Sequence, residues 1–167
     1  MNSSSRSDRL LLFIGSLGYL GFVPFASGTV AVAVVGIPLY LLLVWLKLSV
    51  AAYTTFCVAL TAIAIYVAGR ADIALNEKDS KKNVIDELPG YLIALIGLPA
   101  TWQVVIAAFF IERAIDIAKV PPANWIEKRL PGGWGVVLDD VVAGLYSWGV
   151  LGAAVHFFPK LFGSFPI

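Results

Sequence analysis

Long apolar runs alternate with short polar stretches along this chain, and their lengths predict most of its elements. Residues 30–46 give 17 consecutive positions without a charge, and residues 48–69 give 22. A helix needs about 20 such residues to cross the hydrocarbon core of a bilayer. We therefore expect two membrane helices, joined as a hairpin by a tight turn at Lys47-Leu48-Ser49.

Residues 88–111 form a run of 24 uncharged positions that has two competing interpretations. One helix over the whole run would be about 36 Å long and would cross the bilayer once. Alternatively, residues 88–98 and 101–119 are two helices that turn back at Gly97-Leu98-Pro99-Ala100-Thr101. Proline removes a backbone donor there and disfavours helix at the residue before it.

The distribution of positive charge decides between the two interpretations, because cytoplasmic loops carry an excess of Lys and Arg. With the turn, ten of the twelve basic residues share one side, whereas a single span divides them seven against five. The ten are Arg6, Arg9, Arg70, Lys78, Lys81, Lys82, Arg113, Lys119, Lys128 and Arg129. The turn is therefore favoured, with Lys47 and Lys160 on the opposite side.

Two further apolar stretches complete the expected elements. Residues 136–158 are long enough for a last membrane helix. Residues 10–25 are interrupted by three glycines and Pro24, so we expect an interfacial or re-entrant helix there. A cleaved signal peptide is disfavoured for this stretch, because the small residues after it lead directly into another hydrophobic helix.

Composition places the chain outside the class of ordinary soluble domains. Hydrophobic residues make up 59% of the sequence and the mean hydropathy is +0.86. We therefore expect residues 1–167 to form one domain, an all-α, multi-pass integral membrane helical bundle. A net charge of +1 without a basic run argues against nucleic acid as a partner. Cys57 is the only cysteine, which excludes an intramolecular disulfide and a thiolate metal site.

The predicted topology collects scattered carboxylates at one end of the bundle. Asp86-Glu87 precedes one helix, Asp116 lies near the end of the next, and Asp139-Asp140 begins the last. An Asp at the centre of a membrane helix costs about 2.5–3.5 kcal/mol on insertion scales. Taken singly, these groups fit a structural ion pair with Arg113 or acidic helix N-termini. Three clusters at one end favour a functional site.

The residue types at this end suit phosphate chemistry. Carboxylates without neighbouring thiolates suit a hard cation, Mg²⁺ before Ca²⁺ or Zn²⁺. Arg113 and Lys119 suit a phosphate, arginine as a forked donor and lysine as a point charge. Gly132-Gly133-Trp134-Gly135 allows close backbone approach before the last helix. A cation, phosphate-binding side chains and a membrane together predict hydrolysis of a phosphate ester on a lipid headgroup.

Short motifs follow one another in a distinctive order along most of the chain. They are Ser27-Gly28-Thr29, Val84-Ile85-Asp86-Glu87 followed by Gly90, Arg113-x-x-Asp116, Lys119 with Pro121-Pro122, and Gly132-Gly133-x-Gly135 leading to Asp139-Asp140-x-x-Ala143-Gly144. In their order and spacing they resemble the phosphatidylglycerophosphatase A family of bacteria. The sequence departs from the family pattern at three places. Glu112 replaces an apolar or aromatic residue, Lys119-Val120-Pro121-Pro122 replaces Lys-Pro-Trp-Pro, and Ser27 replaces a proline.

The resemblance implies a Mg²⁺-dependent phosphatase that converts phosphatidylglycerophosphate to phosphatidylglycerol and phosphate in phospholipid biosynthesis. It implies the bacterial cytoplasmic (inner) membrane, with the active site facing the cytoplasm. The expected catalytic residues are Asp86, Glu87, Asp116, Asp139 and Asp140. The expected metal ligands are Asp86, Glu87, Asp139 and Asp140. The expected phosphate-binding residues are Arg113, Lys119 and Thr29.

Several alternatives stay open at this point. The attacking group is either a metal-bound hydroxide or one of the paired aspartates, which would form an aspartyl phosphate. Another lipid phosphate or an isoprenoid phosphate is an alternative substrate. A small transporter or assembly subunit with a buried cation site is the non-enzymatic alternative. Association into a homo-oligomer is compatible with every one of these functions.

Overall fold

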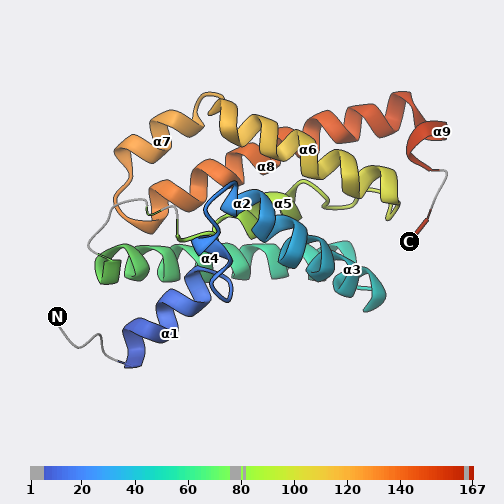
Figure 1. The fold of residues 1–167 in the computed structure, drawn as a ribbon. Coiled ribbons are helices and arrows are strands. Elements are labelled where there is room, and N and C mark those ends of the chain that lie inside the picture. The colour runs from blue at the N-terminus through green and yellow to red at the C-terminus, as the bar shows by residue number, and fades with distance from the viewer. Residues whose placement is uncertain (1–5, 76–79, 81, 164–165) are drawn as a thin grey trace.

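A computed structural model of the protein describes residues 6–75, 80, 82–163 and 166–167. Helices account for about three quarters of the described residues (Figure 1). In chain order they are α1 (Arg6–Gly15), the 3₁₀ turn η1 (Leu20–Phe22), α2 (Ser27–Ala31), the π turn η2 (Val32–Gly36), α3 (Ile37–Trp45), α4 (Val50–Leu75), α5 (Glu87–Ile93), α6 (Trp102–Ala118), α7 (Ala123–Arg129), α8 (Gly133–Phe157) and α9 (Pro159–Phe162). The expected all-α fold class is confirmed.

Among the described residues, three stretches of helix are long and apolar enough to cross a membrane, consistent with the expected membrane bundle. They are Ser27–Trp45, Val50–Ile73 and Gly133–Phe157. The first includes α2, η2 and α3 as one continuous stretch of helix. With 17 residues, α6 is about 26 Å long, slightly short of the roughly 30 Å hydrocarbon core.

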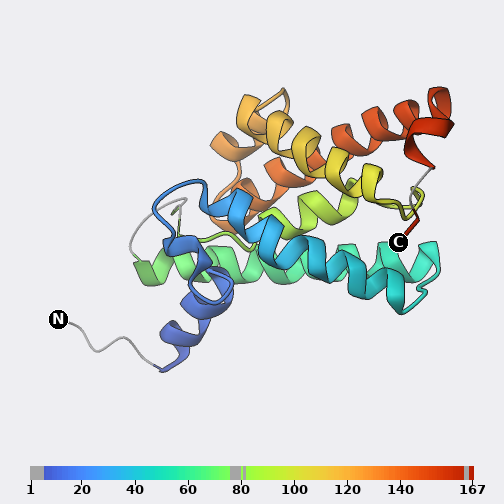
Figure 2. The same cartoon turned by 45° about the vertical axis from the view of Figure 1, so that its right-hand side comes forward.

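Helix α5 lies at the centre of the bundle in both views (Figures 1 and 2). It packs most extensively against α8 and also contacts α4, η2 and α6. All eight residues from Leu88 to Leu95 are buried. A helix enclosed by its neighbours in this way does not need to span the bilayer, because its backbone polar groups are shielded from lipid by protein.

The chain turns back after α5, as the charge distribution indicated, and side chains from other helices satisfy the freed carbonyls. The Tyr53 hydroxyl donates to the Leu92 carbonyl at 2.9 Å, and the Trp148 indole donates to the Ile96 carbonyl at 2.8 Å. Thr101 then accepts a hydrogen bond from the Val104 amide and so caps the start of α6. The helical hairpin formed by α5 and α6 is thus anchored by α4 and α8.

Helices α5 and α8 cross at a pair of glycines. A Cβ atom on Gly144 would overlap the carbonyl oxygen of Gly90 and lie 3.0 Å from its carbonyl carbon. A Cβ on Gly90 would lie 2.8 Å from the carbonyl oxygen of Asp140. The two backbones are therefore in direct contact, which small residues allow in membrane bundles.

The N-terminal segment differs from the expected helix over residues 10–25. Helix α1 ends at Gly15, and Leu17 and Tyr19 then adopt left-handed backbone angles. The Gly15 carbonyl accepts hydrogen bonds from the amides of Val84 and Ile85 at 2.9 and 3.0 Å. The end of α1 thus holds the segment that leads into α5. The sequence did not show this contact because it joins residues almost 70 positions apart.

Substitution of Gly144 by alanine is expected to destabilise the bundle, because the added methyl group would push α5 away from α8. Overpacking of this kind costs about 1–3 kcal/mol. The measurement is the melting temperature of purified protein in detergent. The matched control is Gly149→Ala on the same helix, where an added Cβ would have no neighbour within 4 Å. Equal melting temperatures for the two variants would contradict the close crossing.

Candidate active site

A polar cavity of about 750 Å³ lies between α2, α5, α6 and α8. Every site residue expected from the sequence lines it: Thr29, Asp86, Glu87, Arg113, Asp116, Lys119, Asp139 and Asp140. Gathered around one cavity, they come from four separate parts of the chain. The turn between α5 and α6 makes this convergence possible, because it brings the end of α6 back to the start of α5.

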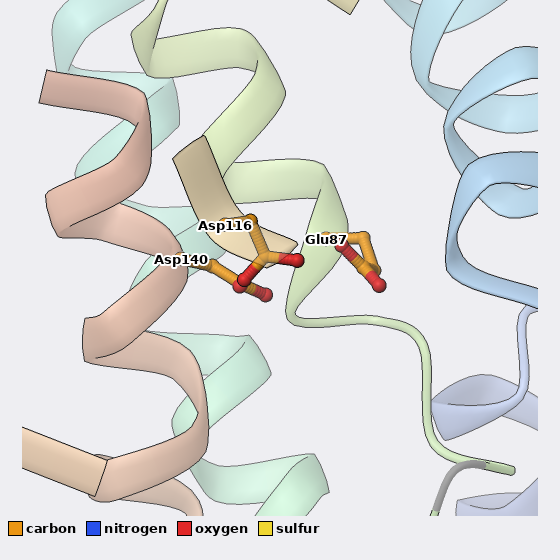
Figure 3. A group of neighbouring side chains, drawn as sticks. All are labelled: Glu87, Asp116 and Asp140. Carbon is orange, nitrogen blue, oxygen red and sulfur yellow. The ribbon is translucent and has the colours of Figure 1, made fainter. Parts of the chain in front are cut away.

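Three carboxylates converge on one point in this cavity (Figure 3). Glu87 is the first residue of α5, Asp116 lies in the last turn of α6, and Asp140 lies in the second turn of α8. One oxygen from each lies within 4.8 Å of the others. Asp140 is buried, and the other two are partly buried. The structure therefore groups Asp116, which was not among the expected metal ligands, with two residues that were.

The other two expected metal ligands lie beside this group of three. Asp86 precedes α5, is buried and lines the same cavity. The Asp139 carboxylate accepts a hydrogen bond from the Lys119 ammonium at 2.8 Å. Lys119 also forms an ion pair with Glu127 of α7 at 3.0 Å. Asp139 is therefore held by a cation from the protein itself.

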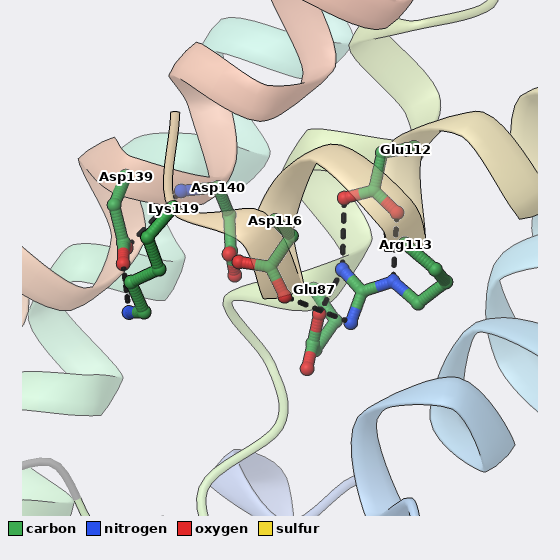
Figure 4. A network of polar contacts seen from close by, with 7 residues as sticks. All are labelled: Glu87, Glu112, Arg113, Asp116, Lys119, Asp139 and Asp140. Atoms are coloured by element: carbon green, nitrogen blue, oxygen red, sulfur yellow. Dashed lines mark hydrogen bonds and ion pairs between the residues drawn. The ribbon is translucent and has the colours of Figure 1, made fainter. Parts of the chain in front are cut away.

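Arg113 is the centre of a second set of contacts (Figure 4). Its guanidinium donates two hydrogen bonds to Glu112, each 2.8 Å long. It also forms ion pairs with Glu87 and, at 3.5 Å, with Asp116. Two of its three partners are therefore members of the converging carboxylate group. Because these contacts occupy all three guanidinium nitrogens, they favour a role for Arg113 in positioning carboxylates alongside its expected role in binding phosphate.

Glu112 is a site residue that the sequence analysis missed. Its side chain is fully buried, and both of its oxygens bind Arg113. Adjacent residues on a helix point in directions about 100° apart, so helical spacing gives no reason to pair them. A charged residue in an otherwise apolar helix segment was the available signal, since a buried carboxylate needs a partner.

Gly28, at the start of α2, lines the cavity and lies directly against Glu87 and Arg113. A Cβ atom there would overlap the Glu87 carboxylate and lie 3.2 Å from a guanidinium nitrogen of Arg113. Only a residue without a side chain allows the α2 backbone to approach both groups. Thr29, the next residue, faces the same cavity.

The charges around the cavity do not balance, and the imbalance fits a bound cation. Five carboxylates and two cations, Arg113 and Lys119, line the cavity. Burial of like charges is unfavourable unless a counter-charge is present. The donors are all carboxylate oxygens, which suit a hard divalent cation. Glu87, Asp116 and Asp140 are the residues that could hold it together.

This environment shifts the pKa values of two groups that line the cavity, Glu87 and Lys119. Burial raises the pKa of Glu87 to about 7, even though Arg113 acts in the opposite direction. For Lys119, burial lowers the pKa, but the hydrogen bonds and charges of Asp139 and Glu127 outweigh burial and raise it overall. Lys119 is therefore charged at neutral pH, whereas Glu87 has a pKa close to neutral pH.

The fold and the cavity together define a class of protein. It is a helical membrane protein with a polar cavity that combines converging carboxylates with a lysine and an arginine, the residue types used in metal-assisted phosphoryl transfer. The family model for phosphatidylglycerophosphatase A matches residues 13–155. The chain belongs to this family and is a phosphatase acting on a phosphate monoester, which excludes the non-enzymatic alternative.

Three bacterial proteins are similar to this chain, and two of them carry the name of the family. Phosphatidylglycerophosphatase A of Escherichia coli is 31% identical over 140 residues, which cover 83% of this chain and 80% of the relative. A Bacteroides thetaiotaomicron protein named "Putative phosphatidylinositol-3-phosphatase" is 34% identical over 157 residues, 89% of this chain and 96% of the relative. Phosphatidylglycerophosphatase A of Haemophilus influenzae is 29% identical over 121 residues, which cover 72% of this chain and 66% of the relative. No solved structure matches the chain.

Replacement of Glu112 by glutamine is expected to weaken cation binding. Without the Glu112 charge, Arg113 would pair more strongly with Glu87 and Asp116 and compete with the cation for them. Loss of such a supporting contact typically weakens metal affinity about 10–100-fold. The measurement is the concentration of divalent cation that gives half-maximal phosphatase activity. The control is Glu127→Gln, which removes a partly exposed partner of Lys119 and should have a smaller effect. Equal effects of both variants would contradict the role of Glu112.

Stabilisation by a divalent cation is expected to increase with pH. Because the pKa of Glu87 is raised in the folded state, the contribution of this group to the free energy of unfolding decreases, without a cation, as pH rises from about 4.5 to 7. A cation binds the deprotonated carboxylate and offsets this loss. The increase in melting temperature on adding Mg²⁺ should therefore be larger at pH 8 than at pH 5.5. Glu87→Gln should reduce the difference, and a pH-independent increase in the unmodified protein would contradict the expectation.

Proposed function

We propose that the protein hydrolyses phosphatidylglycerophosphate to phosphatidylglycerol and phosphate, with Mg²⁺, in phospholipid biosynthesis. The observation that carries this proposal is the convergence of Glu87, Asp116 and Asp140 in one cavity of a member of the phosphatidylglycerophosphatase A family. Two relatives that share about 30% of its residues carry the name of this activity.

Mg²⁺ would be held by Glu87, Asp116 and Asp140, with Asp86 beside them on the same cavity wall. When bound, the ion would polarise the phosphoryl oxygens and neutralise part of their charge. Asp139 is proposed as a catalytic carboxylate adjacent to this set. Its hydrogen bond to Lys119 holds the carboxylate in place, where it can orient a water molecule or accept its proton.

The cationic side chains and Thr29 would fix the substrate phosphate. Lys119 is 41% exposed, so its ammonium can reach a phosphate that enters the cavity. Arg113 would contribute from the cavity wall as the carboxylates that it now contacts turn to the cation. The Thr29 hydroxyl can donate one further hydrogen bond. Together these groups would balance charge on the transferred phosphoryl group.

Two routes of hydrolysis differ in what happens to an aspartate. In direct attack, a water oxygen bonds to phosphorus and loses a proton to a carboxylate, while the P–O bond to the lipid breaks and the departing oxygen takes up a proton. In the covalent route, an aspartate oxygen bonds to phosphorus as the P–O bond to the lipid breaks and the lipid leaves as its alcohol. Water then cleaves the aspartyl phosphate, which releases phosphate and restores the carboxylate. Rapid acid quenching with phosphorus-labelled substrate distinguishes the two, because only the covalent route leaves label on the protein.

The active site is proposed to face the cytoplasm of a bacterial inner membrane. The cavity lies at the end of the bundle where Lys119, Lys128 and Arg129 are found. Basic residues concentrate on the cytoplasmic side of membrane proteins.

A phosphoinositide is the second candidate substrate. The Bacteroides thetaiotaomicron relative, at 34% identity, is named for action on phosphatidylinositol 3-phosphate. Both candidates are phosphate monoesters on a lipid headgroup and therefore need the same cavity chemistry. They differ in the group that carries the phosphate, a glycerol or an inositol ring.

The test is phosphate release by purified protein from phosphatidylglycerophosphate, phosphatidylinositol 3-phosphate and phosphatidic acid, each with Mg²⁺ or with a chelator. We expect the fastest release from phosphatidylglycerophosphate and loss of activity with the chelator. Asp140→Asn should lower kcat about 100-fold or more at an unchanged melting temperature or a higher one, because it removes a charge from a crowded buried site. Faster release from another lipid, or full activity in chelator, would overturn the proposal.

A further inference from the structure

Two of the most exposed apolar side chains in the described part of the chain lie at the rim of the polar cavity. Phe25, just before α2, is 84% exposed, and Ile117, in the last turn of α6, is 74% exposed. Both line the cavity that holds the carboxylates. An exposed apolar residue is common on a membrane protein, but these two also border a charged site, which is not explained by contact with lipid alone.

The rim continues into an apolar face of α6. Ile106, Phe110 and Ile117 are all exposed, and their spacing places them on one side of the helix. Arg113 falls on the same side by spacing, yet it is buried, because the start of α2 at Gly28 lies against it. The apolar face of α6 therefore leads directly to the guanidinium at the wall of the cavity.

The two segments that carry the rim residues, the start of α2 and the end of α6, pack mainly against different elements, although both helices also contact α5. Helix α6 packs mainly against α8, whereas α2 packs against η1, η2 and α5. The cavity lies between them and is lined by residues 23–29 on one side and by Arg113, Asp116 and Ile117 on the other. It is thus bounded by two walls, each with an exposed apolar residue at its edge.

A lipid phosphate poses a specific problem for an enzyme. Its phosphate must reach the carboxylate-lined cavity, but every methylene withdrawn from the bilayer into water costs free energy. A lateral opening with apolar edges solves this problem, because the acyl chains stay in the bilayer while the headgroup enters. Phe25 and Ile117 have the chemistry and the position for such an opening.

We propose that Phe25 and Ile117 form the two sides of a lateral portal that contacts the glycerol backbone and first acyl methylenes of a phospholipid substrate. The portal makes the enzyme selective for membrane-bound phosphate monoesters over soluble ones. This inference rests on the proposed function, since it requires a lipid phosphate as the substrate.

The test compares long-chain phosphatidylglycerophosphate in mixed micelles with its deacylated, water-soluble counterpart. Both molecules carry the same phosphate ester, so they differ only in the part that the portal would contact. The variants are Phe25→Ala, Ile117→Ala and the double variant. The matched controls are Phe157→Ala and Ile63→Ala, which truncate exposed residues of the same types away from the cavity.

We expect each portal variant to lower kcat/KM for the long-chain lipid about tenfold more than for the soluble ester, mainly through KM. The double variant should show a larger difference, and the controls should show none. Equal losses for both substrates would mean that Phe25 and Ile117 support the fold or the membrane position of the protein, and would overturn the portal. Equal effects of control and portal variants would overturn it as well.

The unmodified protein separates this inference from the function on which it rests. Phosphate release from the long-chain lipid, combined with unchanged substrate selectivity in the variants, would leave the proposed function intact and remove only the portal. Release from neither substrate would overturn both. Faster release from the soluble ester than from the lipid would overturn the portal directly.

Discussion

The contacts between the Arg113 guanidinium and three carboxylates are the interaction on which the site depends. Glu112 binds it with both oxygens, and Glu87 and Asp116 pair with it from the side of the cavity. A buried carboxylate without a partner is strongly unfavourable in an apolar bundle. Arg113 therefore allows the protein to hold acidic side chains together before any cation binds, at the depth where their chemistry is needed.

The short buried helix α5 is the second requirement, because it brings Glu87 to this arginine. A full membrane span in its place would carry the following helix to the far side and separate Glu87 from Asp116. The turn after α5 is stabilised by Tyr53 of α4 and Trp148 of α8, which donate hydrogen bonds to carbonyls in and after α5. The packing of α5 in the bundle core therefore also sets the geometry of the site.

The cavity joins two environments that a lipid phosphatase has to connect. Its interior is lined by carboxylates and two cations, whereas its rim carries exposed apolar side chains. Lys119, held between Asp139 and Glu127, lies where the charged interior meets solvent. This gradient from charged to apolar over one cavity matches a substrate with a phosphate at one end and acyl chains at the other. Membership of the phosphatidylglycerophosphatase A family is consistent with it.

Sequence patterns alone predicted the all-α membrane fold, the reversal near Pro99 and the set of acids at one end of the bundle. Run length, proline and the distribution of Lys and Arg are local properties, and bilayer thickness converts them directly into topology. The family motifs added the expected roles of those acids. These roles remain predictions, whereas the convergence of the residues on one cavity is now observed.

Which charged groups touch was set by the three-dimensional arrangement of the helices. It paired Arg113 with its neighbour Glu112, placed Asp116 with Glu87 and Asp140, and gave Asp139 to Lys119. It also ended α1 at Gly15, ten residues before the end of the expected helix. These outcomes depend on the rotation and depth of each helix against the next, which close packing at contacts such as Gly90 and Gly144 sets. No periodicity along a single helix contains that information.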